Sequence, residues 1–411
     1  MKTENPTRKL FVIFASLYFI QGMGEPTAGL LSQPIRSMLK GWGNDSTDIA
    51  TFMFILGFPW YIKPIFGLLT DFVPIKQLRR KSYLIISSSM MIVGFLAISF
   101  LPLDPGFTTI ILIMLLFPSV GIATKDVATD AAMIETGQPL GITGRLQSAQ
   151  WGALYGAGLI LGVLGGWISQ HGYQRLGFII CAIFGVGALY IAIFHINEKP
   201  KIETQKGQFR YALKVLGQAS RNRIVILVAV FIFLLNFNPF SSVVLYMHMS
   251  VELGYSEQFY GVTNTIISLA SILACLLYAL FAKKIPLRLL LHGSVALMVI
   301  SSLVYIGLGS QTSAIIISFA FGFIYMVTSL AQLELAGRYC PPEAAGTVFA
   351  LLMSVWNLSI SLSGILGGWF YESWKISYGV DTAYTLLVVI GAGFTAIGWI
   401  VVPFFPKIQK E

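Results

Sequence analysis

The sequence is poor in charge. Only 11% of its 411 residues are Asp, Glu, Lys or Arg, whereas a soluble domain carries about 25%. Hydrophobic residues make up 56% of the chain and the mean hydropathy is +0.77. The chain therefore lacks the polar side chains that a water-exposed surface needs, and we predict an integral membrane protein in a lipid bilayer.

Cysteine and histidine are also scarce, with three and four residues, and neither shows the spacing of a metal site or a disulfide framework. The sequence has no Gly-x-x-x-x-Gly-Lys phosphate loop and no grouped nucleophile and base. We therefore expect neither an enzyme nor a metal or organic cofactor. The net charge of +9 lies in short loops between apolar runs, so we do not expect a nucleic-acid partner.

Apolar runs of membrane-spanning length recur along the chain. They predict an all-α integral membrane fold with twelve transmembrane helices: residues 10–33, 49–70, 83–102, 108–131, 146–168, 176–195, 224–247, 259–281, 287–308, 312–335, 346–369 and 382–404. A basic linker over residues 198–223 divides the chain. We predict an N-terminal six-helix half (1–197) and a C-terminal six-helix half (224–411).

Lysine and arginine are distributed unevenly over the predicted loops. Most of the 27 such residues lie in the linker and in the other loops on the side of the two termini. Cytoplasmic loops carry the excess of these residues in membrane proteins. We therefore expect both termini in the cytoplasm and the protein in the inner, or cytoplasmic, membrane of a cell.

The two halves share a sequence repeat at an offset of 202 residues. Gly144 aligns with Gly346, and Leu164-Gly-Gly-Trp167 aligns with Leu366-Gly-Gly-Trp369. Both copies cross the membrane in the same direction. This predicts two parallel six-helix pseudo-repeats, the arrangement of the major facilitator superfamily. Small residues of this kind also let helices pack closely.

The loop after the second predicted span has the most specific motif. It reads Gly67-Leu-Leu-Thr-Asp71 and continues to Arg79-Arg80-Lys81. Major facilitators place a similar Gly-xxx-Asp element, followed by basic residues, at this loop. Gly67 would allow close helix contact, and Asp71 would pair with a cation or a helix N-terminus in a cytoplasmic gate. Alternatively, the basic residues serve only to orient the chain.

The stretch from Pro59 to Leu84 resembles the folate–biopterin transporter family, whose pattern is Pro-Trp-x-x-Lys-Pro-x-x-Gly-x-x-x-Asp-x-x-Pro-Ile followed by Arg-Arg and Tyr-Leu. The Asp126-Val-Ala-Thr-Asp130-Ala element is also similar to the muropeptide-permease and acetyl-CoA-transporter branch and to related siderophore importers. The resemblance implies a major facilitator fold and a folate- or pterin-like anion as solute. A siderophore or a muropeptide is the alternative.

Charged residues inside the N-terminal spans allow two interpretations. Each such residue costs about 2.5–3.5 kcal/mol in the middle of a membrane helix unless it is paired or in contact with water. In one, Lys63 or Lys125 binds an anionic group and Glu25 or Asp126 carries a proton for symport. In the other, the lysines pair with Asp126 and Asp130 to hold a gate shut. Glu25, in an irregular Gly- and Pro-rich segment, favours function, and Asp130, near a helix end, favours structure.

The candidate residues fall into two groups. We predict substrate or coupling roles for Glu25, Lys63, Lys125, Asp126, Gln21, Gln150, Trp151, Tyr155, Trp356 and Glu334, and gate or structural roles for Gly67, Asp71, Arg79, Arg80, Asp130 and Arg145. The alternative is that the amides form interhelical hydrogen bonds and that the aromatic residues pack in the core or face lipid.

These patterns predict a secondary active transporter of a small polar or anionic solute. It would work by alternating access about a central site, driven by a proton or by the solute gradient. We expect a monomer. The alternative from another class is a membrane sensor or scaffold that does not transport, but the charges retained in the N-terminal spans favour transport.

Overall fold

The computed structural model describes residues 6–198, 221–281, 285–339 and 345–405, together with residues 200, 214, 217 and 218. Its regular elements are helices, apart from one β-bridge between Ile75 and Leu78. The chain divides into two compact units, Met1–Trp42 with Leu56–Phe209, and Gly43–Ile55 with Arg210–Glu411. The all-α fold is confirmed. The boundaries predicted for the two halves stay a prediction, and most of the predicted linker lies outside the described residues.

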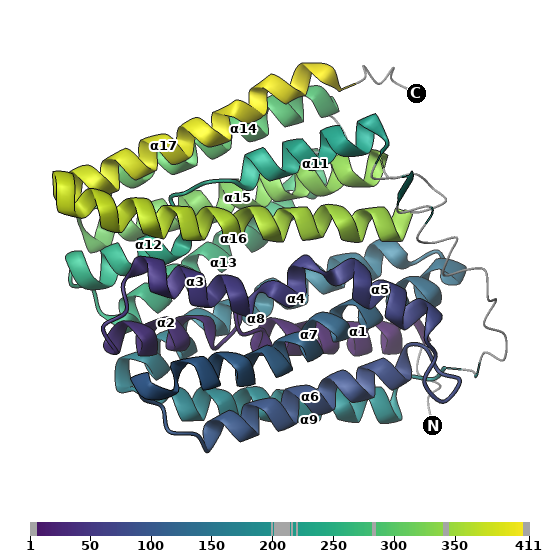
Figure 1. Cartoon of the computed structure of the whole chain (residues 1–411). Coiled ribbons are helices and arrows are strands. Elements are labelled where there is room, and N and C mark those ends of the chain that lie inside the picture. The colour runs from purple at the N-terminus through teal and green to yellow at the C-terminus, as the bar shows by residue number, and fades with distance from the viewer. Residues whose placement is uncertain are drawn as a thin grey trace. The chain divides into compact units, whose positions relative to one another are not determined.

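The first unit is built around long helices. Its elements are α1 (Pro6–Gly24), α2 (Ser32–Gly41), α4 (Phe58–Tyr61), α5 (Lys63–Phe72), α6 (Lys81–Ser99), η1 (Pro105–Phe107), α7 (Thr108–Gly137), η2 (Gln138–Leu140), α8 (Thr143–His171) and α9 (Gln174–Phe194). Helix α1 packs against α8 and α9, and α6 packs against α7 and α9. Figure 1 shows α6 and α9 side by side.

The second unit contains the remaining elements. They are α3 (Ser46–Leu56, except its last residue), α11 (Arg223–Asn236), α12 (Ser242–Met247), the π-helix η3 (His248–Glu252), α13 (Glu257–Phe281), α14 (Leu287–Leu303), η5 (Val304–Gly307), α15 (Gln311–Tyr339), α16 (Ala345–Tyr378), α17 (Val380–Val401) and η7 (Val402–Phe404). Helix α14 lies beside α17 (Figure 1) and also packs against α15. The core of this unit includes Phe231, Val295 and Leu335.

Among the described residues, nine helical segments are long and apolar enough to cross a membrane. They correspond to nine of the twelve predicted spans. The other three predicted spans, the first, second and seventh, are each interrupted and include the shorter apolar helices α3 and α11. The integral membrane character is thus supported by these apolar helices, and the total of twelve spans stays a prediction.

Proline accounts for the interruptions. It lacks a backbone N–H, and its ring clashes with the carbonyl four residues earlier. Pro26 follows the end of α1, Pro59 and Pro64 lie at the starts of α4 and α5, and Pro239 lies in the gap between α11 and α12. The sequence predicted the irregular segment at Glu25, but not the breaks in the second and seventh spans.

The repeated Leu-Gly-Gly-Trp segment has a similar packing role in each unit. A Cβ atom on Gly165 would lie 3.3 Å from the carbonyl oxygen of Leu30, in the segment that follows α1. A Cβ atom on Gly367 would lie 1.8 Å from the carbonyl oxygen of Pro239, in the segment that follows α11. In both units, a glycine therefore lets a long helix approach the interrupted first span, most tightly at Gly367.

Candidate functional site

A buried ion pair joins the start of α5 to the middle of α7 in the first unit. Lys63 is the first residue of α5, and its ammonium pairs with Oδ2 of Asp126 in the middle of α7. The two side chains are only 12% and 5% exposed. Gln21 of α1 donates its amide N–H to the other carboxylate oxygen of Asp126. Three spans that are distant in sequence thus meet at one carboxylate.

This buried cluster of Gln21, Trp60, Lys63 and Asp126 also holds unused hydrogen-bonding capacity. The Lys63 ammonium lies 4.9 Å from the centre of the Trp60 ring, a cation–π distance. Within the described part of the chain, Gln21 Oε1 and Trp60 Nε1 are buried without a hydrogen-bond partner. Buried polar atoms are normally paired, so these two atoms indicate that the cluster has a further partner or a second state.

The second carboxylate of α7 is held by neutral groups. Asp130 accepts a hydrogen bond from the Tyr18 hydroxyl and another from Gln150 Nε2, at 3.2 Å. It lies one turn after Asp126, on the same face of the helix. Of the two carboxylates that we considered as lysine partners, the structure pairs Asp126 with Lys63 and gives Asp130 to a phenol and an amide.

Lys125 and Glu25 lie apart from that ion pair. Lys125 is 1% exposed and donates to the carbonyl oxygen of Leu17, at 2.9 Å. Its ammonium is thus held by the backbone of α1, whereas Asp126 binds side chains of α1 and α5. Glu25 follows α1 in the irregular segment, and its Oε1 accepts the Thr27 hydroxyl hydrogen at 2.6 Å. This is the only side-chain contact described for the Glu25 carboxylate.

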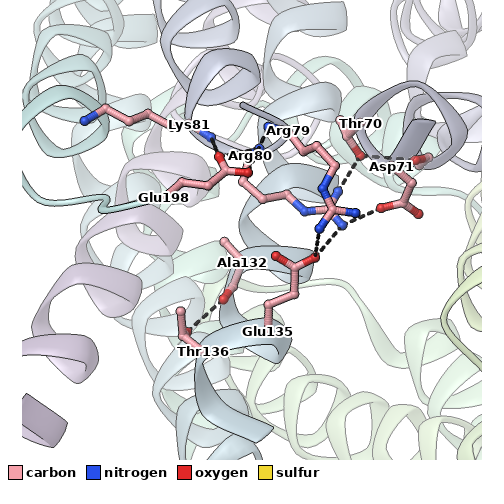
Figure 2. Close-up of polar contacts among 10 residues, drawn as sticks. Thr70, Asp71, Arg79, Arg80, Lys81, Ala132, Glu135, Thr136 and Glu198 are labelled. Carbon is pink, nitrogen blue, oxygen red and sulfur yellow. Dashed lines mark hydrogen bonds and ion pairs between the residues drawn. The ribbon is translucent and has the colours of Figure 1, made fainter. Parts of the chain in front are cut away.

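A second polar network lies at the ends of α5, α6 and α7 (Figure 2). The Arg80 guanidinium pairs with Asp71, pairs with Glu135 at 2.9 Å and donates to the Thr70 hydroxyl at 3.0 Å. Burial disfavours the charge of Arg80, but Asp71 and Glu135 outweigh this effect and raise the pKa of its guanidinium. Arg80 is thus a buried bridge between α5 and α7.

Glu198, just beyond α9, binds the start of α6 (Figure 2). Its carboxylate accepts the backbone N–H groups of residues 79–81, at 2.8 to 2.9 Å. A carboxylate at a helix N-terminus satisfies free N–H groups and suits the helix dipole. Lys81 returns the contact by donating to the Ile193 carbonyl at 2.7 Å. Sequence reasoning missed Glu198, although an acidic residue directly after an apolar span was a usable signal.

Three further candidate residues make packing contacts or only long polar contacts in the structure. A Cβ atom on Gly67 would lie 3.8 Å from Val127, an ordinary contact, so the close approach expected at Gly67 is not seen. Arg79 reaches Glu135 at 3.4 Å through a partly exposed contact. The Arg145 guanidinium lies 5.4 Å from the Phe11 ring centre.

The aromatic candidates are also in packing contacts. Trp151 and Tyr155 of α8 stack with their ring centres 6.1 Å apart. Trp356 of α16 packs against the core of the second unit. Glu334 forms an ion pair with Arg338 and accepts the Tyr278 hydroxyl hydrogen at 2.8 Å.

The second unit has a buried polar pair of its own, but it is neutral. Asn236, the last residue of α11, donates its amide to Gln332 Oε1 of α15 at 2.6 Å. The two residues are 6% and 1% exposed. Interhelical amide bonds of this kind join membrane helices without a net charge.

The contacts above place a buried ion pair among apolar helices, and sequence comparison identifies the family of the chain. The model of the BT1 family matches residues 27–409. The chain belongs to the BT1 family. This BT1 chain is 31% identical to the folate-biopterin transporter of Synechocystis sp., over 88% of this chain and 74% of that protein. It is 24% identical to folate transporter 1 of Plasmodium falciparum, over 84% of this chain and 69% of that protein.

Solved structures show the fold of this BT1 chain. A D-xylose–proton symporter superposes with a TM-score of 0.71 at 15% identity, covering 98% of this chain and 99% of the other. The nucleoside transporter NupG superposes with a TM-score of 0.71 at 14% identity, covering 98% and 100%. The predicted major facilitator fold and the family resemblance are confirmed. The family and the relatives that the chain matches are transporters and not enzymes, so the predicted class of membrane transporter is confirmed.

Proposed function

We propose that this BT1 chain carries a folate- or pterin-like anion across the cytoplasmic membrane of a cell in symport with a proton. It acts as a monomer with both termini in the cytoplasm. The observation that carries the proposal is the buried ion pair of Lys63 and Asp126, with Gln21 and Trp60 beside it. The names of the two relatives, a folate-biopterin transporter and a folate transporter, support the choice of solute.

The buried cluster can bind an anionic solute and can also release it, as transport requires. Charges in membrane helices are costly and mark solute pathways and proton relays. Lys63 is the cation for an anionic group, Asp126 and Glu25 are the carboxylates for a proton, and Trp60 offers an aromatic face. The stacked Trp151 and Tyr155 are a second aromatic surface for a planar ring.

The remaining candidates take supporting roles in this proposal. Asp71, Arg80 and Glu135, with Arg79 beside them, brace the ends of three helices, so that the first unit moves as a body during alternating access. Asp130 holds α7 to α1 and α8 through Tyr18 and Gln150. Trp356 packs against the core of the second unit, whose buried amide pair is neutral.

The test is uptake by the purified protein in liposomes. We expect labelled folic acid or pterin-6-carboxylate to accumulate when the outside is acidic, and a protonophore to abolish accumulation. Excess ferric siderophore or muropeptide should not compete. Competition by either would favour the alternative solute. Uptake of none of these solutes under any gradient would contradict transport of this class and favour a sensor or scaffold.

A further inference from the structure

The ion pair in the buried cluster is arranged so that Lys63 can bind another anion in place of Asp126. We propose that an anionic group of the solute replaces Asp126 on Lys63, and that the released Asp126 carboxylate then takes up a proton. The inference rests on the proposed function and deepens it. It names Asp126 as the proton carrier, Lys63 as the anion site, and the exchange between their partners as the coupling step.

Charge balance is the first argument. Lys63 and Asp126 are 12% and 5% exposed and together are neutral. An anion that binds Lys63 leaves the cluster with one excess negative charge, which is unfavourable in a poorly polarisable interior. A proton on Asp126 restores neutrality. The ionic contact between Lys63 and Asp126 breaks, and one between Lys63 and the solute anion forms. One O–H bond forms on Asp126, with a proton taken from the water that enters with the solute.

Gln21 provides a partner for both states of Asp126. Its amide N–H now donates to Asp126 Oδ1, which stabilises the charged carboxylate. Its own Oε1 is buried and, within the described part of the chain, has no hydrogen-bond partner. A protonated Asp126 is a donor, and a rotated Gln21 amide would accept that hydrogen through Oε1. The unused acceptor of Gln21 is therefore what the second state requires.

Trp60 provides the corresponding support for Lys63. The ammonium lies 4.9 Å from the centre of the Trp60 ring, so part of its positive charge remains stabilised when Asp126 leaves. Trp60 Nε1 is buried and is not hydrogen-bonded to any described residue. An indole N–H is a donor only, so it suits an incoming carboxylate beside Lys63.

Other titratable groups surround Asp126 and must be separated from it in any test. Helices α1, α4, α5, α6 and α8 all pack against α7. The titratable or charged groups near the cluster on these elements, on the segment after α1 and on α7 itself are Tyr18, Glu25, Lys63, Tyr83, Lys125 and Asp130.

Three of these groups have other partners. Asp130 is bonded to Tyr18 and Gln150, and Lys125 is bonded to the Leu17 carbonyl. Glu25 has one side-chain hydrogen bond among the described residues, from Thr27, so it is the competing proton site.

Calorimetric binding measures the proton directly. We would titrate the purified protein with pterin-6-carboxylate in buffers of different protonation enthalpy and obtain the protons bound per ligand. The exchange predicts uptake of about one proton per ligand for the wild type near neutral pH. It predicts none for 6-hydroxymethylpterin, which has the same ring without the carboxylate.

Variants assign the proton to one residue. Asp126→Asn should bind pterin-6-carboxylate without proton uptake, and Asp126→Glu should restore the uptake. If Asp126→Asn does not fold, Lys63→Gln/Asp126→Asn keeps the cluster neutral and should bind the uncharged pterin but not the anion. Arg338→Gln, which breaks an exposed ion pair in the second unit, is the matched control and should keep the wild-type value.

The outcomes separate this inference from the proposed function. Binding of pterin-6-carboxylate by the wild type without proton uptake overturns the exchange and leaves the solute class standing. Proton uptake that persists in Asp126→Asn but disappears in Glu25→Gln also overturns it, because the proton then belongs to Glu25. If the wild type binds neither pterin, the proposed function itself is wrong.

Discussion

The two units bury polar side chains of different kinds in their membrane helices. The first unit buries an ion pair, Lys63 with Asp126, and the second buries an amide pair, Asn236 with Gln332. An amide pair keeps its hydrogen bond at any pH, whereas an ion pair changes when a proton or another ion arrives. This difference favours the proposal that ion coupling takes place in the first unit, because the buried pair of the second unit is neutral.

The architecture of the two units is nevertheless similar. Each interrupts its first predicted span, after Gly24 and after Asn236, and each brings a glycine of the repeated segment toward that break, Gly165 or Gly367. The repeat therefore preserved the backbone arrangement while the buried side chains diverged. Five substitutions test this contrast.

The largest effect is expected when one partner of the ion pair is removed. Lys63→Met leaves the Asp126 carboxylate buried without its cation, which should destabilise the protein by about 3–5 kcal/mol. Thermal unfolding in detergent would measure the loss, and liposome uptake should fall to background. Lys63→Met/Asp126→Leu should recover most of the stability without recovering uptake. A stable, active Lys63→Met would show that the pair is dispensable.

Glu25→Gln tests whether a second carboxylate of the first unit takes part. Because the exchange proposed above places the proton on Asp126, we expect accumulation driven by a pH gradient to persist in Glu25→Gln. A loss of about tenfold for each pH unit in a one-to-one symport, with exchange of labelled for unlabelled solute continuing, would place the proton on Glu25 instead. The protein should reach the membrane at the wild-type level. Gradient-driven accumulation equal to wild type would remove Glu25 from the proton pathway.

Arg80→Gln tests the network in Figure 2. It leaves Asp71 and Glu135 without their shared guanidinium, which should lower stability by about 1–3 kcal/mol. The uptake rate should fall, while the pH dependence of uptake stays unchanged because Arg80 is not in the buried cluster. A shifted pH dependence would show that this network takes part in proton coupling.

Gln332→Leu tests the neutral pair of the second unit. It removes the interhelical acceptor of the Asn236 amide, which keeps its hydrogen bond to the Ile232 carbonyl. Interhelical bonds of this kind average about 0.6 kcal/mol. We expect a small fall in the unfolding temperature and the same number of protons moved per solute. The contrast between the units would be broken if proton coupling were lost.

Glu334→Gln should have the smallest effect. Its ion pair with Arg338 is partly exposed, with side chains 24% and 44% accessible, and exposed pairs contribute about 0–1 kcal/mol. We expect stability and accumulation near wild type. A strong loss of gradient-driven uptake would instead support the coupling role that the sequence allowed for Glu334.

Sequence alone located the costly groups but not their partners. The rarity of charge in apolar spans singled out Lys63, Asp126 and Asp130, because such residues need a compensating contact. Which lysine meets which carboxylate depends on helix rotation and on the break at Pro64, and neither can be read from hydropathy. The spacing of Tyr18 and Gln21 on one helix face was a usable signal for Tyr18.

Contacts made through the backbone were the hardest to predict. Glu198 binds N–H groups of residues 79–81. Because every residue except proline has a backbone N–H, the sequence does not show which of these groups a carboxylate binds. The break before Pro239 had a usable signal, the Asn238-Pro239 dipeptide, although the predicted span ran across it. Repeated glycines, by contrast, predicted a shared packing role, which Gly165 and Gly367 have.

The most direct test of proton coupling through the first unit follows the pH inside liposomes that contain the protein. Addition of pterin-6-carboxylate outside should acidify the interior in the absence of any imposed pH gradient, and 6-hydroxymethylpterin should not. Asp126→Asn should abolish the acidification, whereas Gln332→Leu should retain it. Acidification by Asp126→Asn at the wild-type rate would contradict the assignment of coupling to the buried ion pair.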